Sequence, residues 1–100
     1  MSDLSDQSTS EIERTVEFME EIHTKLGSGE YDEARQRATE LHEHAECELC
    51  ATLGTSMMGA CIWVQTMPME GAGWRAEQVM KGVETWLGQI GRPVMEGLNE

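Results

Sequence analysis

The chain has few basic residues: 7 lysines and arginines stand against 19 aspartates and glutamates, so the net charge is -12. A field of this sign repels nucleic acid and anionic membrane surfaces and attracts basic partners at long range. The imbalance is local, because residues 1–50 hold 14 acidic and 4 basic residues, whereas residues 51–100 hold 5 and 3. Direct binding of DNA or RNA is therefore disfavoured, and a macromolecular partner with a basic surface is favoured.

Long apolar runs are also lacking. A membrane-spanning helix needs a run of about 18 apolar residues, and the sequence has neither such a run nor the pattern of a secretory leader. The three cysteines are an odd number, so they cannot all pair within one chain. We therefore expect a reduced, cytoplasmic protein that does not enter a membrane.

Aspartate is scarce, with only Asp3, Asp6 and Asp32 beside 16 glutamates. A salt-adapted surface usually carries the two acids in similar numbers, so it explains this composition poorly. Glutamate is the better helix former of the two. The acidity therefore fits helical structure.

Apolar residues recur at helical spacing in the first half of the chain. Ser10 and Glu13 form a capping-box pattern, which predicts a first helix from about Glu11 to Gly27, after a flexible N-terminus of residues 1–9. A second helix is predicted from Tyr31 or Asp32 to about residue 50. The predicted inner stripes are Ile12, Val16, Met19, His23 and Leu26, with Phe18 and Ile22 at the edges, and then Ala34, Ala38, Leu41, Ala45, Leu49 and Thr52.

The second half predicts two further helical segments. Gly54-Thr55-Ser56 is expected to interrupt the chain, and residues 57–67 then predict a short buried helix closed by Pro68. After a loop, the last long helix is predicted from about Trp74 to Ile90, and residues 94–98 are expected to form a terminal turn. The sequence GEYDEARQRA, residues 29–38, resembles the opening of a tetratricopeptide-type helical hairpin. The predicted fold is all-α, a bundle of four helical segments forming a single domain over residues 10–100.

The sequence HEHAECELC, residues 42–50, concentrates metal-ligand residue types. If the second helix continues through residue 50, its two histidines point to nearly opposite sides. That leaves His44, Cys47 and Cys50 as candidate metal ligands, and a structural zinc ion needs a fourth. Cys61, His23 or a second subunit are the candidates for that ligand.

The same cysteines allow two other interpretations, a redox pair and hydrophobic packing. A thioredoxin-like redox pair requires a helix N-terminus, whereas this CxxC motif is predicted to end a helix. Free cysteines also pack as small hydrophobic residues. Packing is the favoured reading of Cys47 and Cys50, so no cofactor is expected.

Catalytic patterns are lacking. The sequence shows no Ser-His-Asp arrangement, no glycine-rich phosphate loop after a strand and no EF-hand spacing. Of the ExxH spacings that di-iron bundles use in pairs, only Glu20 and His23 fit. A non-enzymatic protein is expected.

Two groups of residues are candidates for partner binding. Carboxylates one helical turn apart lie about 6 Å apart along the axis, a spacing comparable with that of backbone phosphates, so rows of glutamates could occupy a basic nucleic-acid groove. Methionine and tryptophan are favoured at adaptable interfaces, and Trp63 and three neighbours surround the loop at residues 67–73. The predicted partner-binding residues are Glu13, Glu17, Glu20, Glu21, Glu40, Glu43, Glu46, Glu48, Met67, Met69 and Trp74.

In size, acidity and helical content the chain resembles the small inhibitors of phages and mobile elements, the anti-restriction and anti-CRISPR proteins, several of which imitate DNA. The resemblance implies an inhibitor that occupies a basic surface of a larger protein or ribonucleoprotein. Two alternatives come from other features. One is a metal-binding regulator that uses His44, Cys47 and Cys50. The other is an adaptor that forms a homodimer through the last helix, where Gly82 and Gly88 interrupt the pattern.

Overall fold

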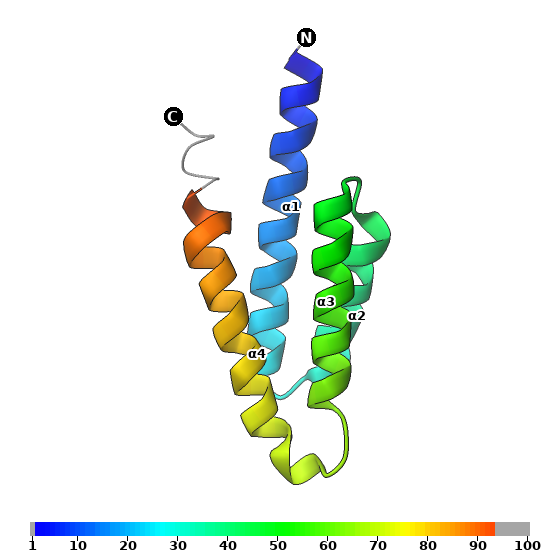
Figure 1. The fold of residues 1–100 in the computed structure, drawn as a ribbon, viewed down its shortest axis with the longest axis vertical. Helices are drawn as coiled ribbons and strands as arrows, with labels where there is room; N and C mark the ends of the chain where they lie inside the picture. Colours follow the sequence, from blue (N-terminus) through cyan, green and yellow to red (C-terminus); the bar gives the residue numbers. More distant parts are fainter. Residues whose placement is uncertain (1, 94–100) are drawn as a thin grey trace.

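The computed structural model describes the backbone of residues 2–93 and the side chains of residues 11–93. Over this range the chain forms four α-helices and no strand, so the predicted all-α bundle is confirmed (Figure 1). The predicted turn at residues 94–98 lies outside the described residues. The elements are α1 (Ser2–Gly27), α2 (Tyr31–His44), α3 (Glu48–Val64), the 3-10 turn η1 (Met69–Gly71), α4 (Ala72–Trp86) and the π-helical turn η2 (Leu87–Gly91).

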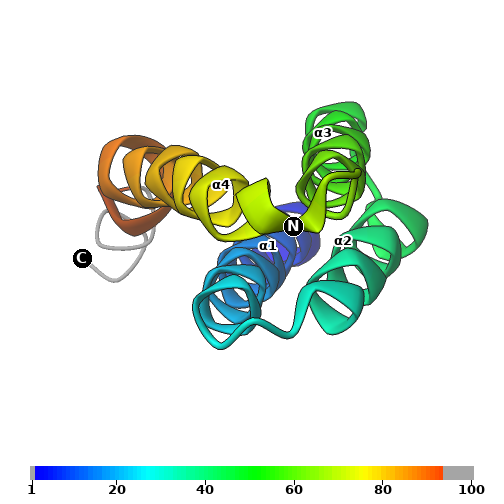
Figure 2. The same cartoon turned by 90° about the horizontal axis from the view of Figure 1, so that it is seen from below.

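Each helix runs antiparallel to the one before it (Figure 1). Viewed end-on, α1 lies beside α2 and α4, while α3 packs chiefly on α2 and also contacts α4 (Figure 2). The α2–α3 connection and the α3–α4 connection consequently lie at opposite ends of the bundle (Figure 1). Within residues 2–93, every helix is too short or too polar to span a lipid bilayer.

The core takes side chains from all four helices. The buried hydrophobic residues are Val16, Met19, Ile22, Leu26, Ala34, Ala38, Leu41, Met57, Cys61, Val64, Ala72, Ala76, Val83 and Leu87. Burial of a large aliphatic side chain contributes about 1.5 to 3 kcal/mol, so this core is the main source of stability. The predicted inner stripe of α1 is confirmed at Val16, Met19 and Leu26, whereas His23 is only half-buried.

The start of α1 differs from the prediction. The helix begins at Ser2 and passes through Ser10, so the predicted capping box at Ser10 and Glu13 is wrong. Helix formation here extends through a polar segment whose local sequence carries no apolar stripe. The predicted flexibility of residues 1–9 is a statement about motion, which a single structure does not test, so it stays a prediction.

The second helix is shorter than predicted. α2 ends at His44, Ala45 and Cys47 adopt extended backbone angles, and α3 begins at Glu48. The Glu11 carboxylate accepts the backbone N–H groups of Glu46 and Cys47 at 2.7 and 2.9 Å, which satisfies donors that a continuous helix would use internally. As a result Leu49, predicted to face inward, is 83% exposed.

The predicted interruption at Gly54-Thr55-Ser56 is also wrong, because α3 runs through it without a break. Gly54 is buried against α2. A Cβ atom placed on Gly54 would lie 2.7 Å from the His42 Cα and backbone nitrogen atoms. Glycine here therefore permits α2 and α3 to approach closely, and does not end a helix.

The last helix begins at Ala72, slightly before the predicted Trp74, and continues beyond Trp86 as the π-helical turn η2. A π turn changes the rotation per residue, and Ile90, within this turn, is 51% exposed. Cβ atoms at Gly82 and Gly88 would meet nothing within 4 Å. Within the described residues, these two glycines therefore do not serve to let another helix approach closely. A homodimer contact through the last helix stays a prediction.

Candidate functional site

Four large apolar side chains are exposed at the end of the bundle where α3 joins α4. Met67 is 81% exposed, Trp74 61%, and Trp63 and Met69 are exposed by nearly half. Trp63 and Trp74 pack edge to face, with ring centroids 6.1 Å apart and an interplanar angle of 72°. We refer to these four residues as the apolar end; three of them, Met67, Met69 and Trp74, are predicted partner-binding residues.

A buried arginine fixes the backbone beneath the apolar end. The Arg75 guanidinium donates hydrogen bonds to the carbonyl oxygen of Val64 at 3.2 and 3.3 Å, to that of Pro68 at 3.0 Å and to that of Thr66. Val64 is the last residue of α3, and Thr66 and Pro68 belong to the α3–α4 connection, which also includes a cis Met67–Pro68 peptide. The fork of N–H donors on one planar group can satisfy several carbonyls at once. Met67 and Met69 therefore project from a backbone that Arg75 holds in place.

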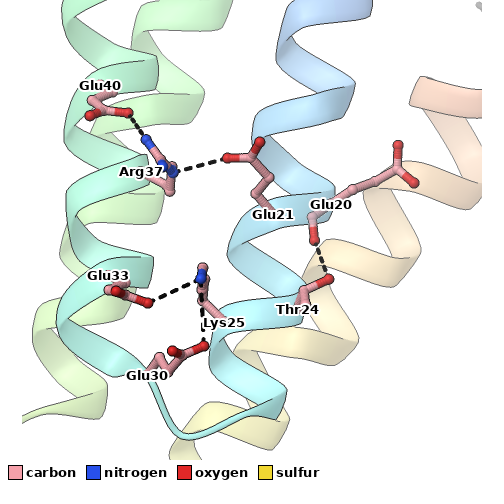
Figure 3. Close-up of polar contacts among 8 residues, drawn as sticks. All are labelled: Glu20, Glu21, Thr24, Lys25, Glu30, Glu33, Arg37 and Glu40. Atoms are coloured by element: carbon pink, nitrogen blue, oxygen red, sulfur yellow. Dashed lines mark hydrogen bonds and ion pairs between the residues drawn. The ribbon is translucent and has the colours of Figure 1, made fainter.

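Three of the predicted glutamates form a row on α1. Glu13, Glu17 and Glu20 are all exposed, and no ion pair within residues 11–93 involves any of them. Figure 3 shows the Glu20 carboxylate directed away from α2. We refer to these residues as the α1 glutamate row, and its carboxylates form no ion pair with the described residues.

Glu21 and Glu40 differ from that row because they share one cation. Arg37 lies 3.0 Å from the Glu21 carboxylate and 2.5 Å from that of Glu40, joining α1 to α2 (Figure 3). Lys25 likewise pairs with two carboxylates, its Nζ lying 3.6 Å from that of Glu30 and 3.0 Å from that of Glu33. The hydrogen bond to Glu33 raises the pKa of Lys25 above its usual value. The face between α1 and α2 is thus partly neutralised.

The second predicted row does not follow one helix. Glu43 belongs to α2, Glu46 to the connection and Glu48 to the first turn of α3, because the predicted helix breaks between them. Their regular phosphate-like spacing is therefore wrong. All three are exposed and have no ion pair within residues 11–93, so a role in partner binding stays a prediction.

The cysteine motif lies beside this acidic connection and begins a helix, contrary to the prediction that it ends one. Cys47 is the N-cap of α3, and its sulfur accepts the Cys50 backbone N–H at 3.3 Å. Glu11 reaches the same point from α1. One ligand atom from each of Cys47, Cys50 and Glu11 lies within 4.8 Å of the other two.

The histidines of the motif lie outside this cluster. His44, a predicted metal ligand, is not among the three clustered residues, and its carbonyl oxygen is 3.5 Å from Arg14 Nη1. His42 Nδ1 lies 3.1 Å from the Ala51 carbonyl oxygen and 3.0 Å from the Thr55 hydroxyl. These two contacts join α2 to α3. Glu11 replaces His44 as the third potential ligand.

The charges at the cluster follow from its hydrogen bonds and burial. Burial raises the pKa of Glu11, but the backbone N–H groups of Cys47 and Glu46 outweigh it and hold this pKa below its usual value. The stabilisation that Glu11 supplies is consequently present above the unfolded pKa of 4.5 and is lost as the pH falls through the lower folded value. Burial and a hydrogen bond with Cys47 raise the pKa of Cys50 to about 11. At neutral pH Glu11 is a carboxylate and Cys50 a thiol.

A pocket of about 560 Å³ adjoins the cluster. Its walls come from α1, α3, α4 and η2, and this volume lies within the range of small-molecule sites. Its apolar lining residues are Ile12, Leu49, Leu53, Trp86 and Ile90. Glu11, Cys47 and Cys50 also line it, so a group bound at the cluster would be reached from the pocket.

The three thiols should differ in reactivity. Cys47 is exposed, whereas burial raises the pKa of Cys61 to about 11, close to that of Cys50. At pH 8 a thiol of pKa 11 is ionised in about one molecule in a thousand, and the thiolate is the nucleophile. We expect iodoacetamide to alkylate Cys47 rapidly in the reduced, metal-free chain, with the other two sites following only slowly. Peptide mass spectrometry over time measures this; equal rates at Cys47 and Cys50 would contradict it.

No protein-family model matches the chain, and no curated protein or solved structure is detectably similar to it.

Proposed function

We propose that the chain is a small non-enzymatic interaction protein that binds a larger protein or ribonucleoprotein carrying a basic surface. The observation that carries the proposal is the apolar end, where Trp63, Met67, Met69 and Trp74 are exposed at the junction of α3 and α4 and the two tryptophans pack edge to face. Tryptophan and methionine are favoured at the centres of interfaces because they bury large areas and adapt to their surroundings.

Preorganisation supports the same proposal. A contact surface that is already rigid loses less conformational entropy when it binds. Arg75 holds the carbonyls of the loop beneath Met67 and Met69, and the two indole rings support one another. The apolar end therefore resembles a preformed anchor.

The α1 glutamate row supports the choice of a basic partner. Uncompensated carboxylates accelerate encounters with positive surfaces and add salt-sensitive attraction. Carboxylates on successive turns could follow the positions that phosphates occupy in a nucleic-acid groove. We propose that the protein acts as an inhibitor in this way, as the resemblance to anti-restriction and anti-CRISPR proteins implies, and that it works in the reducing cytoplasm, where its three thiols stay free.

The test is quantitative affinity capture from a lysate of the organism that encodes the chain. Wild type is compared with the double variant Met67→Ser/Trp74→Ala and with the triple variant Glu13→Lys/Glu17→Lys/Glu20→Lys. Loss of an anchoring tryptophan costs about 2 kcal/mol or more, so the apolar-end variant should bind the captured partner at least about 30-fold more weakly. The charge-reversed variant should bind about tenfold more weakly and respond less to salt.

Matched controls test whether the loss of any exposed apolar side chain, or the reversal of any exposed charge, would weaken binding. Leu49→Ser removes an equally exposed apolar side chain at the opposite end of the bundle, and Glu77→Lys reverses an exposed glutamate on α4. Both should bind like wild type, with circular dichroism confirming that all variants fold. A partner that binds the apolar-end variant with unchanged affinity would refute the proposal.

A further inference from the structure

We propose that Cys47, Cys50 and Glu11 form a binding site for Zn²⁺. Two sulfur ligands and one carboxylate converge there from segments far apart in the sequence: Glu11 from α1, and Cys47 and Cys50 from the N-cap and first turn of α3. Paired thiolates select zinc over magnesium and calcium, while the harder carboxylate is a poor ligand for Cu⁺. The site lies at the opposite end of the bundle from the apolar end, so it does not depend on the proposed partner binding (Figure 1).

The spacing fits a tetrahedral centre after small side-chain rotations. Zinc binds sulfur at about 2.3 Å and carboxylate oxygen at about 2.0 to 2.2 Å, which places neighbouring ligand atoms about 3.5 to 3.8 Å apart. The three ligand atoms already lie within 4.8 Å of one another, so closure by about 1 Å completes the set. Rotation of the exposed Cys47 side chain can supply much of this movement.

The surroundings orient the ligands. The Thr15 hydroxyl lies 3.5 Å from the Cys50 sulfur and 2.8 Å from the Glu11 carbonyl oxygen. One Glu11 oxygen accepts the two backbone N–H groups of the α2–α3 connection, which fixes the direction of the carboxylate. Such contacts around a site raise metal affinity because they hold the ligands in place.

The charge around the site favours a cation. Glu46 and Glu48 flank Cys47 in the sequence, and both are exposed. On binding, each thiol releases its proton to solvent, so the two thiolates and the Glu11 carboxylate together carry one negative charge more than Zn²⁺ neutralises. Because Glu11, Cys47 and Cys50 also line the apolar pocket, water or a small ligand could reach the fourth coordination position from it.

The experiment uses the full chain, treated with chelator and kept reduced with a phosphine. Zinc is titrated in competition with a chromophoric chelator, and Co²⁺ serves as a spectroscopic probe. We expect one Zn²⁺ per chain and, with Co²⁺, a thiolate-to-metal charge-transfer band together with the strong visible bands of tetrahedral coordination. Failure to bind one equivalent, or a Co²⁺ spectrum without the thiolate band, overturns the proposal.

Variants identify the ligands. Cys47→Ser and Cys50→Ser should each lower zinc affinity by more than about 100-fold, since loss of an orienting neighbour alone costs 10-fold to 100-fold. Glu11→Gln should weaken binding and change the Co²⁺ bands. Cys61→Ala removes a buried thiol of the core, and Glu13→Gln removes a carboxylate two residues along the same helix; both should bind like wild type. Unchanged affinity in either serine variant overturns the assignment.

Discussion

Replacing Gly54 with alanine should destabilise the bundle by about 3 kcal/mol, the upper part of the range for overpacking a close contact. The added Cβ would lie 2.7 Å from the His42 Cα and backbone nitrogen and 2.9 Å from the His42 Cβ. These atoms belong to the α2 backbone and cannot rotate away as a flexible side chain can. The two helices must therefore separate, and the core contacts between α2 and α3 weaken. Urea unfolding followed by circular dichroism measures the loss as a lower midpoint at unchanged slope.

The matched control for Gly54 is Gly59, which lies in the same helix. A Cβ at Gly59 would meet nothing within 4 Å. Alanine is the better helix former by about 1 kcal/mol, so Gly59→Ala should leave stability unchanged or raise it slightly. Equal unfolding midpoints for the two alanine variants would show that α2 and α3 do not approach as closely as the structure places them.

Replacing Arg75 with methionine should cost about 3 kcal/mol or more. The guanidinium is buried and supplies the hydrogen bonds to the carbonyl oxygens of Val64, Thr66 and Pro68. The Val64 carbonyl oxygen is buried, and a buried acceptor left without a donor costs about 1 to 3 kcal/mol. The carbonyl oxygens of Thr66 and Pro68 are only partly buried and add less, while methionine keeps much of the apolar stem of arginine without any donor. Unfolding by urea gives the free energy, and tryptophan fluorescence, to which Trp63 and Trp74 at the apolar end contribute together with Trp86, follows the same transition.

Two controls isolate the geometry of the guanidinium. Arg75→Lys retains the positive charge but cannot reach three carbonyls as a planar fork does, so its stability should fall between those of wild type and Arg75→Met. Arg35→Met removes an exposed arginine that forms no ion pair within residues 11–93, and its effect should stay within about 0.5 kcal/mol. Equal free energies of unfolding for Arg75→Met and Arg35→Met would contradict the role assigned to Arg75.

The helical class could be predicted because the apolar periodicity of this chain is local information. Val16, Met19 and Leu26 recur at helical spacing, and Val83 and Leu87 repeat the pattern in the last helix. Burial of one face needs no knowledge of which helix covers it. For the same reason the α1 glutamate row could be anticipated, whereas the exposure of Met67 and Trp74 depends on how the α3–α4 connection folds.

The boundary between α2 and α3 could not be predicted because a distant residue determines it. Residues 42–50 contain neither proline nor glycine, and cysteine is not among the preferred N-cap residues. The break is stabilised by the carboxylate of Glu11, which is 35 residues from Glu46. The same long-range contact brings Glu11 to the two cysteines, whereas spacing along the sequence favours His44 as the third ligand.

The roles of Gly54 and Arg75 are not visible in the local sequence for a related reason. A glycine beside threonine and serine resembles a helix stop, yet its function here depends on the close approach of His42 from another helix. An arginine near the start of a helix usually points to solvent. Only the folding of the α3–α4 connection around Arg75 brings three carbonyl oxygens within its reach.

Hydroxyl-radical footprinting of the chain, alone and bound to its captured partner, tests the central claim most directly. Met67 and Trp74 are exposed and easily oxidised, and Leu49 is equally exposed at the opposite end as an internal reference. We expect oxidation of Met67 and Trp74 to fall several-fold in the complex while that of Leu49 stays constant. Unchanged oxidation of Met67 and Trp74, with protection elsewhere on the chain, would contradict the assignment of the apolar end as the binding surface.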